Sequence, residues 1–140
     1  MEPTTTGAAG SPPQNAEAEA SLLGALLIDS DAIVKIADTV SALDFYDKRH
    51  ERIYTAINEL YEQHKAIDVL TLADQLKNTG YLDSIGGPSY LTELTNFVPT
   101  AAHVEQYAEI VAQKSLRRRL IAASKEITGL GYDESKGLRE

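Results

Sequence analysis

The three histidines are the residues of this chain best suited to acid–base catalysis or metal binding, and they lie far apart at His50, His64 and His103. None belongs to an HExxH pattern, which places two imidazoles on one face of a helix. His50 precedes Glu51, and such a pair can transfer protons in catalysis. Both residues also suit the first turn of an amphipathic helix. We favour this second interpretation and predict no catalytic residue.

Motifs for cofactors and metals are missing as well. Cysteine is absent, which excludes thiolate ligands, disulfides and cysteine nucleophiles. No phosphate-binding loop of the GxxxxGK or GxGxxG type occurs. Glu17 and Glu19 point to different faces of a helix, and Asp29 with Asp31 matches only the start of a calcium-binding loop. We predict no cofactor and no metal, and explain Glu17 and Glu19 by their favourable position near a helix N-terminus.

Charge is distributed unevenly along the chain. The 140 residues have a net charge of −8, and the first hundred carry 15 acidic against 6 basic side chains. Nucleic-acid binding depends largely on basic groups that displace counterions from phosphates, so we predict little of it here. The one basic cluster, Lys114 with Arg117 to Arg119, can contact a phosphate backbone or an acidic partner. We prefer a structural role, in which the arginines flank an apolar stripe and pair with Glu109 and Glu126.

Apolar residues recur at helical spacing through nearly the whole chain, and no useful β-alternation interrupts them. The first helix begins after Asn15, a good N-cap residue, and its leucines between Leu22 and Leu27 form a wide apolar stripe. Residues 1–13 consist mainly of Thr, Gly, Ala, Ser and Pro and are predicted to be disordered. The fold class predicted from these patterns is all-α.

Capping and turn signals divide the middle of the chain into short helices. The predicted starting points are, in chain order, Asp29 or Ser30, Asp47, Thr71 and Ser89. The segment Thr71-Leu72-Ala73-Asp74 has the form of a capping box, and Gly80 suits the left-handed residue that ends a helix. Leu43–Tyr46 is predicted to be a short turn whose apolar groups pack on the core.

The last helix is predicted to be the longest, from about Ala101 to Leu130, capped by Pro99-Thr100 and ended by Gly129 and Gly131. Its apolar residues form two sets, Val104, Tyr107 and Val111, then Leu116, Leu120, Ala123, Ile127 and Leu130. A gap of five residues separates the sets. The helix therefore either bends near Lys114-Ser115 or meets different neighbours with its two halves. The heptad-like spacing of the second set is typical of helices that pair with another helix.

The total length and hydropathy indicate one domain with a sizeable core. No apolar run approaches the ~20 residues of a membrane span, and the N-terminus lacks the pattern of a secretory signal. We therefore expect a soluble, cytosolic domain. In the absence of catalytic motifs, its expected function is to bind other proteins.

Ordered motifs across residues 12–135 resemble the N-terminal domain of DnaB-type bacterial replicative helicases. They are Pro12-Pro13-Gln14-Asn15, Glu17-Ala18-Glu19, Leu23 to Leu27 with Asp29, Asp44-Phe45-Tyr46 with His50, Ile67-Asp68-Val69, Thr71-Leu72-Ala73, Gly86-Gly87 with Tyr90-Leu91, Pro99 to Ala102, Tyr107-Ala108, Ile110-Val111, Lys114 to Leu120 and Gly131-Tyr132-Asp133. Each motif alone is a weak signal, but their number and order make a specific one.

The resemblance implies a compact helical head followed by a helical hairpin or long C-terminal helix. Members of the family pair through the hairpin, and three pairs form a collar above six motor domains. Primase and a helicase loader dock on this collar. The motor unwinds DNA 5′ to 3′ with ATP and magnesium, so those cofactors are implied for an absent RecA-like domain and not for this chain. The implied location is the bacterial cytoplasm, in the replisome.

This resemblance also suggests domain boundaries. We expect a disordered tail at 1–13, a helical head at 14–98, a hairpin or dimerisation region at 99–131, and the start of a linker to a motor domain at 132–140. Self-association is assigned by hypothesis to one set of apolar residues, namely Tyr107, Val111, Leu116, Leu120, Ile127 and Leu130.

Two alternatives fit the same patterns. The helicase-binding domain of a primase has a related helical head and hairpin, although the Pro-Pro-Gln-Asn opening near the chain start argues against it. A stand-alone adaptor or inhibitor that mimics the collar is the other. A reading frame that continues past codon 140 into a GxxxxGK motif favours the helicase, whereas a stop codon favours the adaptor.

Overall fold

The computed structural model of the chain describes residues 10–135 and residue 137, and its regular elements are all helical. In chain order they are α2 (Ala16–Ile28), η1 (Ser30–Ala32), α3 (Ile33–Ile36), η2 (Ala42–Asp44), α4 (Lys48–Glu62), α5 (Val69–Thr79), α6 (Gly87–Thr95) and α7 (Val104–Tyr132), where η1 and η2 are 3-10 turns. This confirms the all-α prediction. Of the tail predicted to be disordered, residues 1–9 lie outside the described part.

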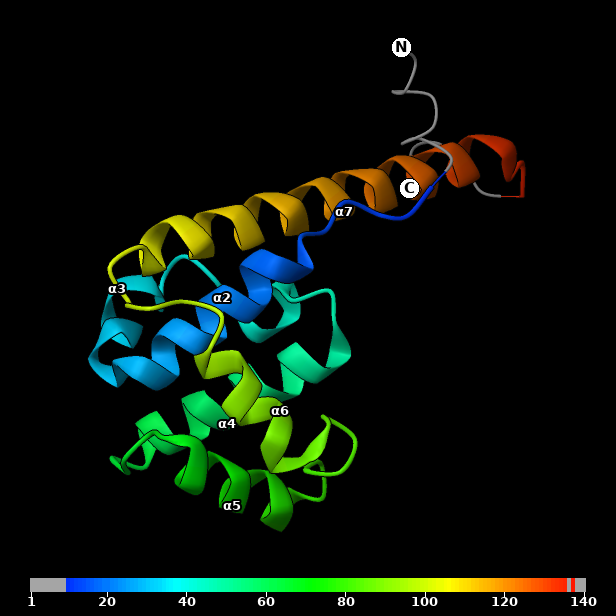
Figure 1. Cartoon of the computed structure of the whole chain (residues 1–140). Helices are drawn as coiled ribbons and strands as arrows, with labels where there is room; N and C mark the ends of the chain where they lie inside the picture. The colour runs from blue at the N-terminus through cyan, green and yellow to red at the C-terminus, as the bar shows by residue number, and fades with distance from the viewer. Residues whose placement is uncertain (1–9, 136, 138–140) are drawn as a thin grey trace.

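We call the helices between residues 14 and 98 the head, and helix α2 lies at its centre (Figure 1). It contacts α4, α6 and α7, and its residues Leu22, Leu23 and Leu26 have no exposed surface. A helix that is apolar on nearly all sides is stable only when other elements surround it. Asn15 caps the helix as predicted, because its side-chain oxygen accepts a hydrogen bond of 2.9 Å from the Ala18 amide.

Helices α4, α5 and α6 pack together on the side of α2 that faces away from α7 (Figure 1). Ile53 and Ile57 of α4, Leu72 of α5, and Leu91 and Leu94 of α6 are all fully buried between them. Their spacing of three to four residues within each helix places them on one face. The amphipathic patterns of the sequence therefore correspond to the buried faces of these helices.

Two helices begin earlier than the sequence predicted. Helix α5 is capped by Asp68, whose carboxylate accepts the Thr71 amide at 2.8 Å while the Thr71 hydroxyl accepts the Asp68 amide at 2.9 Å. Thr71 is thus the third helical residue of the capping box and not its N-cap, so the prediction was wrong by three residues. Helix α6 begins at Gly87 and not at Ser89, because Pro88 fits the first turn of a helix.

Three glycines were predicted to end helices, and the structure confirms this for Gly80 but not for Gly129 and Gly131. Gly80 ends α5 with a φ of +87°, as predicted. Gly129 and Gly131 were predicted to end the last helix, but α7 continues through both to Tyr132. Neither has a positive φ, so neither provides the left-handed conformation that stops a helix.

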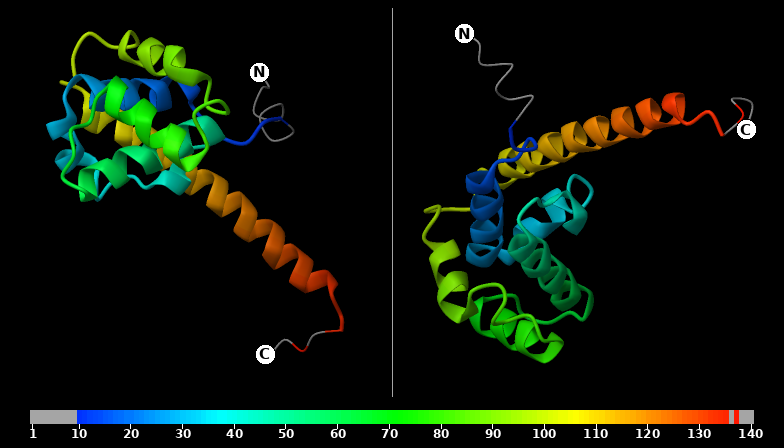
Figure 2. Two further views of the ribbon diagram at one scale, coloured as in Figure 1. Left: turned by 90° about the horizontal axis from the view of Figure 1, so that it is seen from below. Right: turned by 90° about the vertical axis from the view of Figure 1, so that its right-hand side faces the viewer.

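Helix α7 is one continuous helix of 29 residues that begins at Val104. Its first half lies against α2 and α3, and its second half extends away from the head (Figure 2). The sequence allowed either a bend near Lys114-Ser115 or different neighbours for the two halves of the helix. The structure shows the second alternative, because the helix continues without a break. No second arm of a hairpin occurs in the described residues. Of the two predicted forms, a hairpin or a long C-terminal helix, the structure shows the long helix.

Candidate association surface

Four apolar side chains form an exposed stripe on the part of α7 that extends from the head. Leu116, Leu120, Ile127 and Leu130 are 43%, 61%, 68% and 46% exposed, respectively. At 100° per residue, all four fall within about 80° of the helix circumference. We call these four residues the apolar stripe, and residues 116–132 the free arm. Side chains of this type are usually buried, so their alignment marks a candidate contact surface.

The side of α7 that packs on the head is a different one. Val104, Ala108, Val111 and Ser115 are its buried residues, at spacings of four, three and four. Their mean direction is rotated by about 110° from the apolar stripe around the helix axis. The gap of five residues in the sequence pattern therefore marks a change of face.

The six residues predicted for self-association are divided by this change of face. Val111 is 2% exposed and belongs to the core, and the partly buried Tyr107 packs against that core. These two residues contact the chain's own head. The other four form the apolar stripe and are the exposed members of the set.

A third face of the free arm lies beside the N-terminal segment. Pro12 and Pro13 line a groove with Ile121 and Ala122 of α7. The α7 residues of this groove point about half a turn away from the apolar stripe. The segment leaves the stripe uncovered.

The basic cluster at the base of the free arm does not form the predicted ion pairs. In the described part of the chain, neither Glu109 nor Glu126 pairs with an arginine of α7. Arg118 instead donates hydrogen bonds to two backbone carbonyls, Pro13 at 2.7 Å and Asp44 at 2.6 Å. The prediction of a structural role therefore holds for Arg118, but its partners are carbonyl oxygens of two other segments and not carboxylates of α7.

A buried polar network connects three helices of the head. His50 Nδ1 lies 2.8 Å from Glu19 Oε1, and His50 Nε2 lies 2.6 Å from the Tyr90 hydroxyl. His50 and Glu19 are 1% and 2% exposed. The Glu19 carboxylate also accepts the amides of Tyr46 at 2.7 Å and Asp47 at 3.3 Å. The network therefore joins α2, α4, α6 and the segment before α4.

Sequence reasoning missed this network. It placed His50 and Glu51 in the first turn of an amphipathic helix and explained Glu19 by its position in the first turn of another helix. A signal was present, because Glu19 precedes Leu22 and Leu23 by three and four residues, and Glu19 therefore lies on the buried side of α2. His50 stands at the same spacing before Ile53 and Tyr54. A sequence alone does not show that these two faces meet.

The electrostatics of the network indicate a structural role. Each polar group in it has a partner, because the Glu19 carboxylate accepts two amides and each ring nitrogen of His50 lies within hydrogen-bonding distance of Glu19 or of the Tyr90 hydroxyl. The Arg49 guanidinium donates to Asp47 and holds the pKa of that carboxyl below its usual value, and the same pair raises the pKa of Arg49. Burial raises the pKa of the Tyr90 hydroxyl, which opposes its use as a nucleophile.

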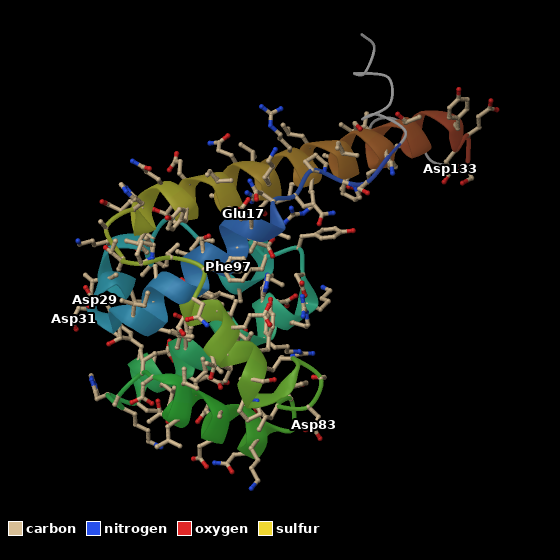
Figure 3. All side chains as sticks on the ribbon, in the orientation of Figure 1. Glu17, Asp29, Asp31, Asp83, Phe97 and Asp133 are labelled. Carbon is tan, nitrogen blue, oxygen red and sulfur yellow. The ribbon has the colours of Figure 1, made fainter. Side chains whose placement is uncertain are left out.

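Asp29, Asp31 and Asp83 are exposed to solvent. Asp29 caps η1 by accepting the Asp31 amide at 3.2 Å, and both lie at the end of α2, far from Asp83 (Figure 3). Among the described residues, no group of three or more His, Asp and Glu side chains is placed to hold a metal ion.

None of the helices in that part of the chain has the length and hydropathy of a membrane span.

These features define an all-helical domain, with a head that packs around α2 and an arm that carries an exposed apolar stripe. Comparison with known proteins identifies the family. The family model "DnaB-like helicase N terminal domain" matches residues 11–113, and the chain belongs to this family. The match is to the N-terminal domain and not to a motor domain, and it decides against the helicase-binding domain of a primase.

Similar proteins support the assignment. The chain is 45% identical over 121 residues to the replicative DNA helicase DnaB of Leifsonia xyli and 42% identical over 121 residues to the replicative DNA helicase DnaC of Bacillus subtilis. These alignments cover 86% of this chain but only 26% and 27% of the relatives, so the chain spans about a quarter of their length.

Solved structures share the fold. The N-terminal domain of DnaB helicase from Mycobacterium tuberculosis superposes with a TM-score of 0.87 at 41% identity, covering 91% of this chain and 88% of that one. A second structure, of a DnaB-like replicative helicase and its interactions with primase, gives a TM-score of 0.74 at 24% identity over 82% of this chain and 27% of that one. This second likeness shows the fold alone.

Proposed function

We propose that this chain is the collar domain of a hexameric replicative DNA helicase and that it associates with copies of itself through the apolar stripe of α7. The parent protein in this proposal unwinds DNA 5′ to 3′ at the replication fork, using ATP and magnesium bound by a motor domain. The collar contributes no catalysis. Its own work is to join subunits and to present a docking surface for primase and for a helicase loader in the bacterial cytoplasm.

The single observation that carries the proposal is the apolar stripe on a helix that leaves the head. A second copy offers the complementary surface, because two such stripes can pack against each other as in a helical pair. Three pairs arranged as a ring provide the collar that the family resemblance implies. The net charge of −8 favours protein partners over nucleic acid.

The strength of the pairing follows from the exposed surface. Fully burying a leucine or isoleucine contributes about 1.5–3 kcal/mol, and these side chains are about half exposed, so each gains about 1 kcal/mol. Two copies bury eight such side chains, which together stabilise the dimer by about 8 kcal/mol. Association opposes this with a loss of translational and rotational freedom that costs about 4–15 kcal/mol. We therefore expect a weak dimer that depends on concentration and becomes stable only within a larger ring.

Sedimentation equilibrium between about 10 μM and 1 mM tests the proposal, since this range brackets weak affinities. The wild-type chain should show a mass that rises with concentration. A variant with Leu120→Asp and Ile127→Asp should remain monomeric over the same range and keep its helix content by circular dichroism.

The matched control places the same change on another face. Ile121 and Tyr132 are also exposed apolar residues of α7, but they lie well away from the apolar stripe. Ile121→Asp with Tyr132→Asp should associate like the wild type. An equal mass for the wild type and the stripe variant at every concentration would contradict the proposal.

A further inference from the structure

The free arm leaves the head at one small cluster of polar contacts. Ser115 is the last buried residue of α7, and its hydroxyl donates to Asp44 Oδ1 at 2.7 Å. One turn further on, Arg118 donates to the Asp44 carbonyl at 2.6 Å and to the Pro13 carbonyl at 2.7 Å. We call these three hydrogen bonds the junction. No residue of α7 after Arg118 is buried or half-buried within the described part of the chain.

Arg118 suits this position for chemical reasons. Its guanidinium is planar and carries several donors in fixed directions, so one side chain can hold two carbonyl oxygens from separate segments. Hydrogen bonds from a charged donor are stronger than those between neutral groups. The Arg118 guanidinium also lies 5.4 Å from the centre of the Tyr46 ring, which adds a cation–π contact. Lysine cannot reproduce this fork.

The partner of Arg118 is itself held firmly in the head. Asp44 Oδ2 accepts the Ser41 amide at 2.8 Å, and Phe45 is buried in the core. The next two amides, of Tyr46 and Asp47, donate to the buried Glu19 carboxylate. The segment 44–47 is therefore fixed from both sides, by α7 at one end and by α2 at the other.

We propose that Arg118, together with Ser115, is a positioning residue that sets the direction in which the free arm leaves the head. The buried face of α7 ends at Ser115, so apolar packing holds the helix only up to that point. The two Arg118 hydrogen bonds of the junction lie almost one turn beyond Ser115 and restrain the helix there. Given the proposed function, this direction decides the angle at which two apolar stripes meet, and so the geometry of the ring.

A distance measured within one chain tests this inference. The chain has no cysteine, so Lys77→Cys on α5 and Glu126→Cys on the free arm provide two unique sites for spin labels. Double electron–electron resonance then gives the distribution of distances between head and arm. Labelled protein diluted into unlabelled protein reports only distances within one chain, so the test does not depend on association. A monomeric mass in sedimentation equilibrium would therefore contradict the proposed function but not this inference.

The size of the effect follows from geometry. Glu126 lies eleven residues beyond Ser115, which is about 16 Å along a helix, so a swing of 10° moves the label by about 3 Å. We expect a narrow distribution in the wild type and a distribution shifted or broadened by about 3 Å or more in Arg118→Ala. Ser115→Ala should give a smaller change in the same sense. Arg118→Lys, which keeps the charge but not the fork, should fall between wild type and Arg118→Ala.

Arg117→Ala is the matched control, because it removes the same side chain one position away, at an exposed site. Its distance distribution should equal that of the wild type. If Arg118→Ala is folded by circular dichroism and also matches the wild type, the inference is overturned. If Arg118→Ala does not fold, Arg118→Lys and Ser115→Ala decide the question by the same distances, and wild-type distributions in both would overturn it.

Discussion

Replacing Gly24 by alanine is expected to destabilise the head, although alanine is the better helix former. A Cβ atom at Gly24 would lie 2.1 Å from the carbonyl oxygen of Leu94. Contacts of Cβ atoms below 3.0 Å are essentially never seen, so α2 and α6 must separate by about 1 Å or more. The obstacle is backbone, and a flexible side chain cannot move out of the way.

The free-energy change can be estimated from two opposing effects. Overpacking a well-packed core costs about 1–3 kcal/mol, and a clash with backbone belongs at the upper end. Alanine gains about 1 kcal/mol over glycine inside a helix. The net loss is about 2 kcal/mol, and at about 4 °C per kcal/mol for a head of this size the melting temperature should fall by about 8 °C.

Thermal unfolding followed by circular dichroism measures this effect, with Gly129→Ala as the matched control. An added Cβ at Gly129 meets nothing within 4 Å, so this second substitution should raise helix content and leave the melting temperature unchanged or slightly higher. A melting temperature of Gly24→Ala equal to or above that of the wild type would show that α2 and α6 accommodate the added Cβ atom without cost, and would contradict this prediction.

Two further predictions concern the buried polar groups. Glu19→Gln should lower the free energy of unfolding by about 2 kcal/mol in urea titrations, because the glutamine side chain has one acceptor oxygen and three donors point at this position. Glu17→Gln, at a nearby exposed position, is the control and should stay within about 0.5 kcal/mol of the wild type. Burial raises the pKa of Tyr54 from 10.0 to about 12, so its neutral form is favoured in the folded state. The stability that this shift contributes is present below pH 10 and is lost as the pH rises towards about 12, and Tyr54→Phe should reduce the fall of the melting temperature in this alkaline range.

Local physics explains why most helices could be predicted. The N-cap at Asn15, the terminator at Gly80 and the apolar faces of α2 and α4 depend on residues within one or two turns of each other, so their signals lie close together in the sequence. The error at the start of α5 is also local. The capping box was predicted to run from Thr71 to Asp74, whereas in the structure it runs from Asp68 to Thr71.

The candidate surface was predicted in part. The apolar spacing after Leu116 correctly indicated a face of α7 separate from the one on which Val111 lies. It did not show that Val111 is enclosed by the chain's own core, because the burial of a residue depends on which elements pack over it. The partners of Arg118 were out of reach for the same reason, since Asp44 and Pro13 lie 74 and 105 residues away along the chain.

The helical class, the positions of most helices and the apolar stripe on the last one can be predicted from residue patterns alone, because these properties arise from contacts between near neighbours. Long-range packing brings His50 to Glu19 and Tyr90, gives the two halves of the continuous helix α7 different surroundings, and places Arg118 against two carbonyls at the base of the free arm. These outcomes depend on how helices pack across long separations in the chain, where side chains of distant segments compete for the same space and the same hydrogen-bonding groups.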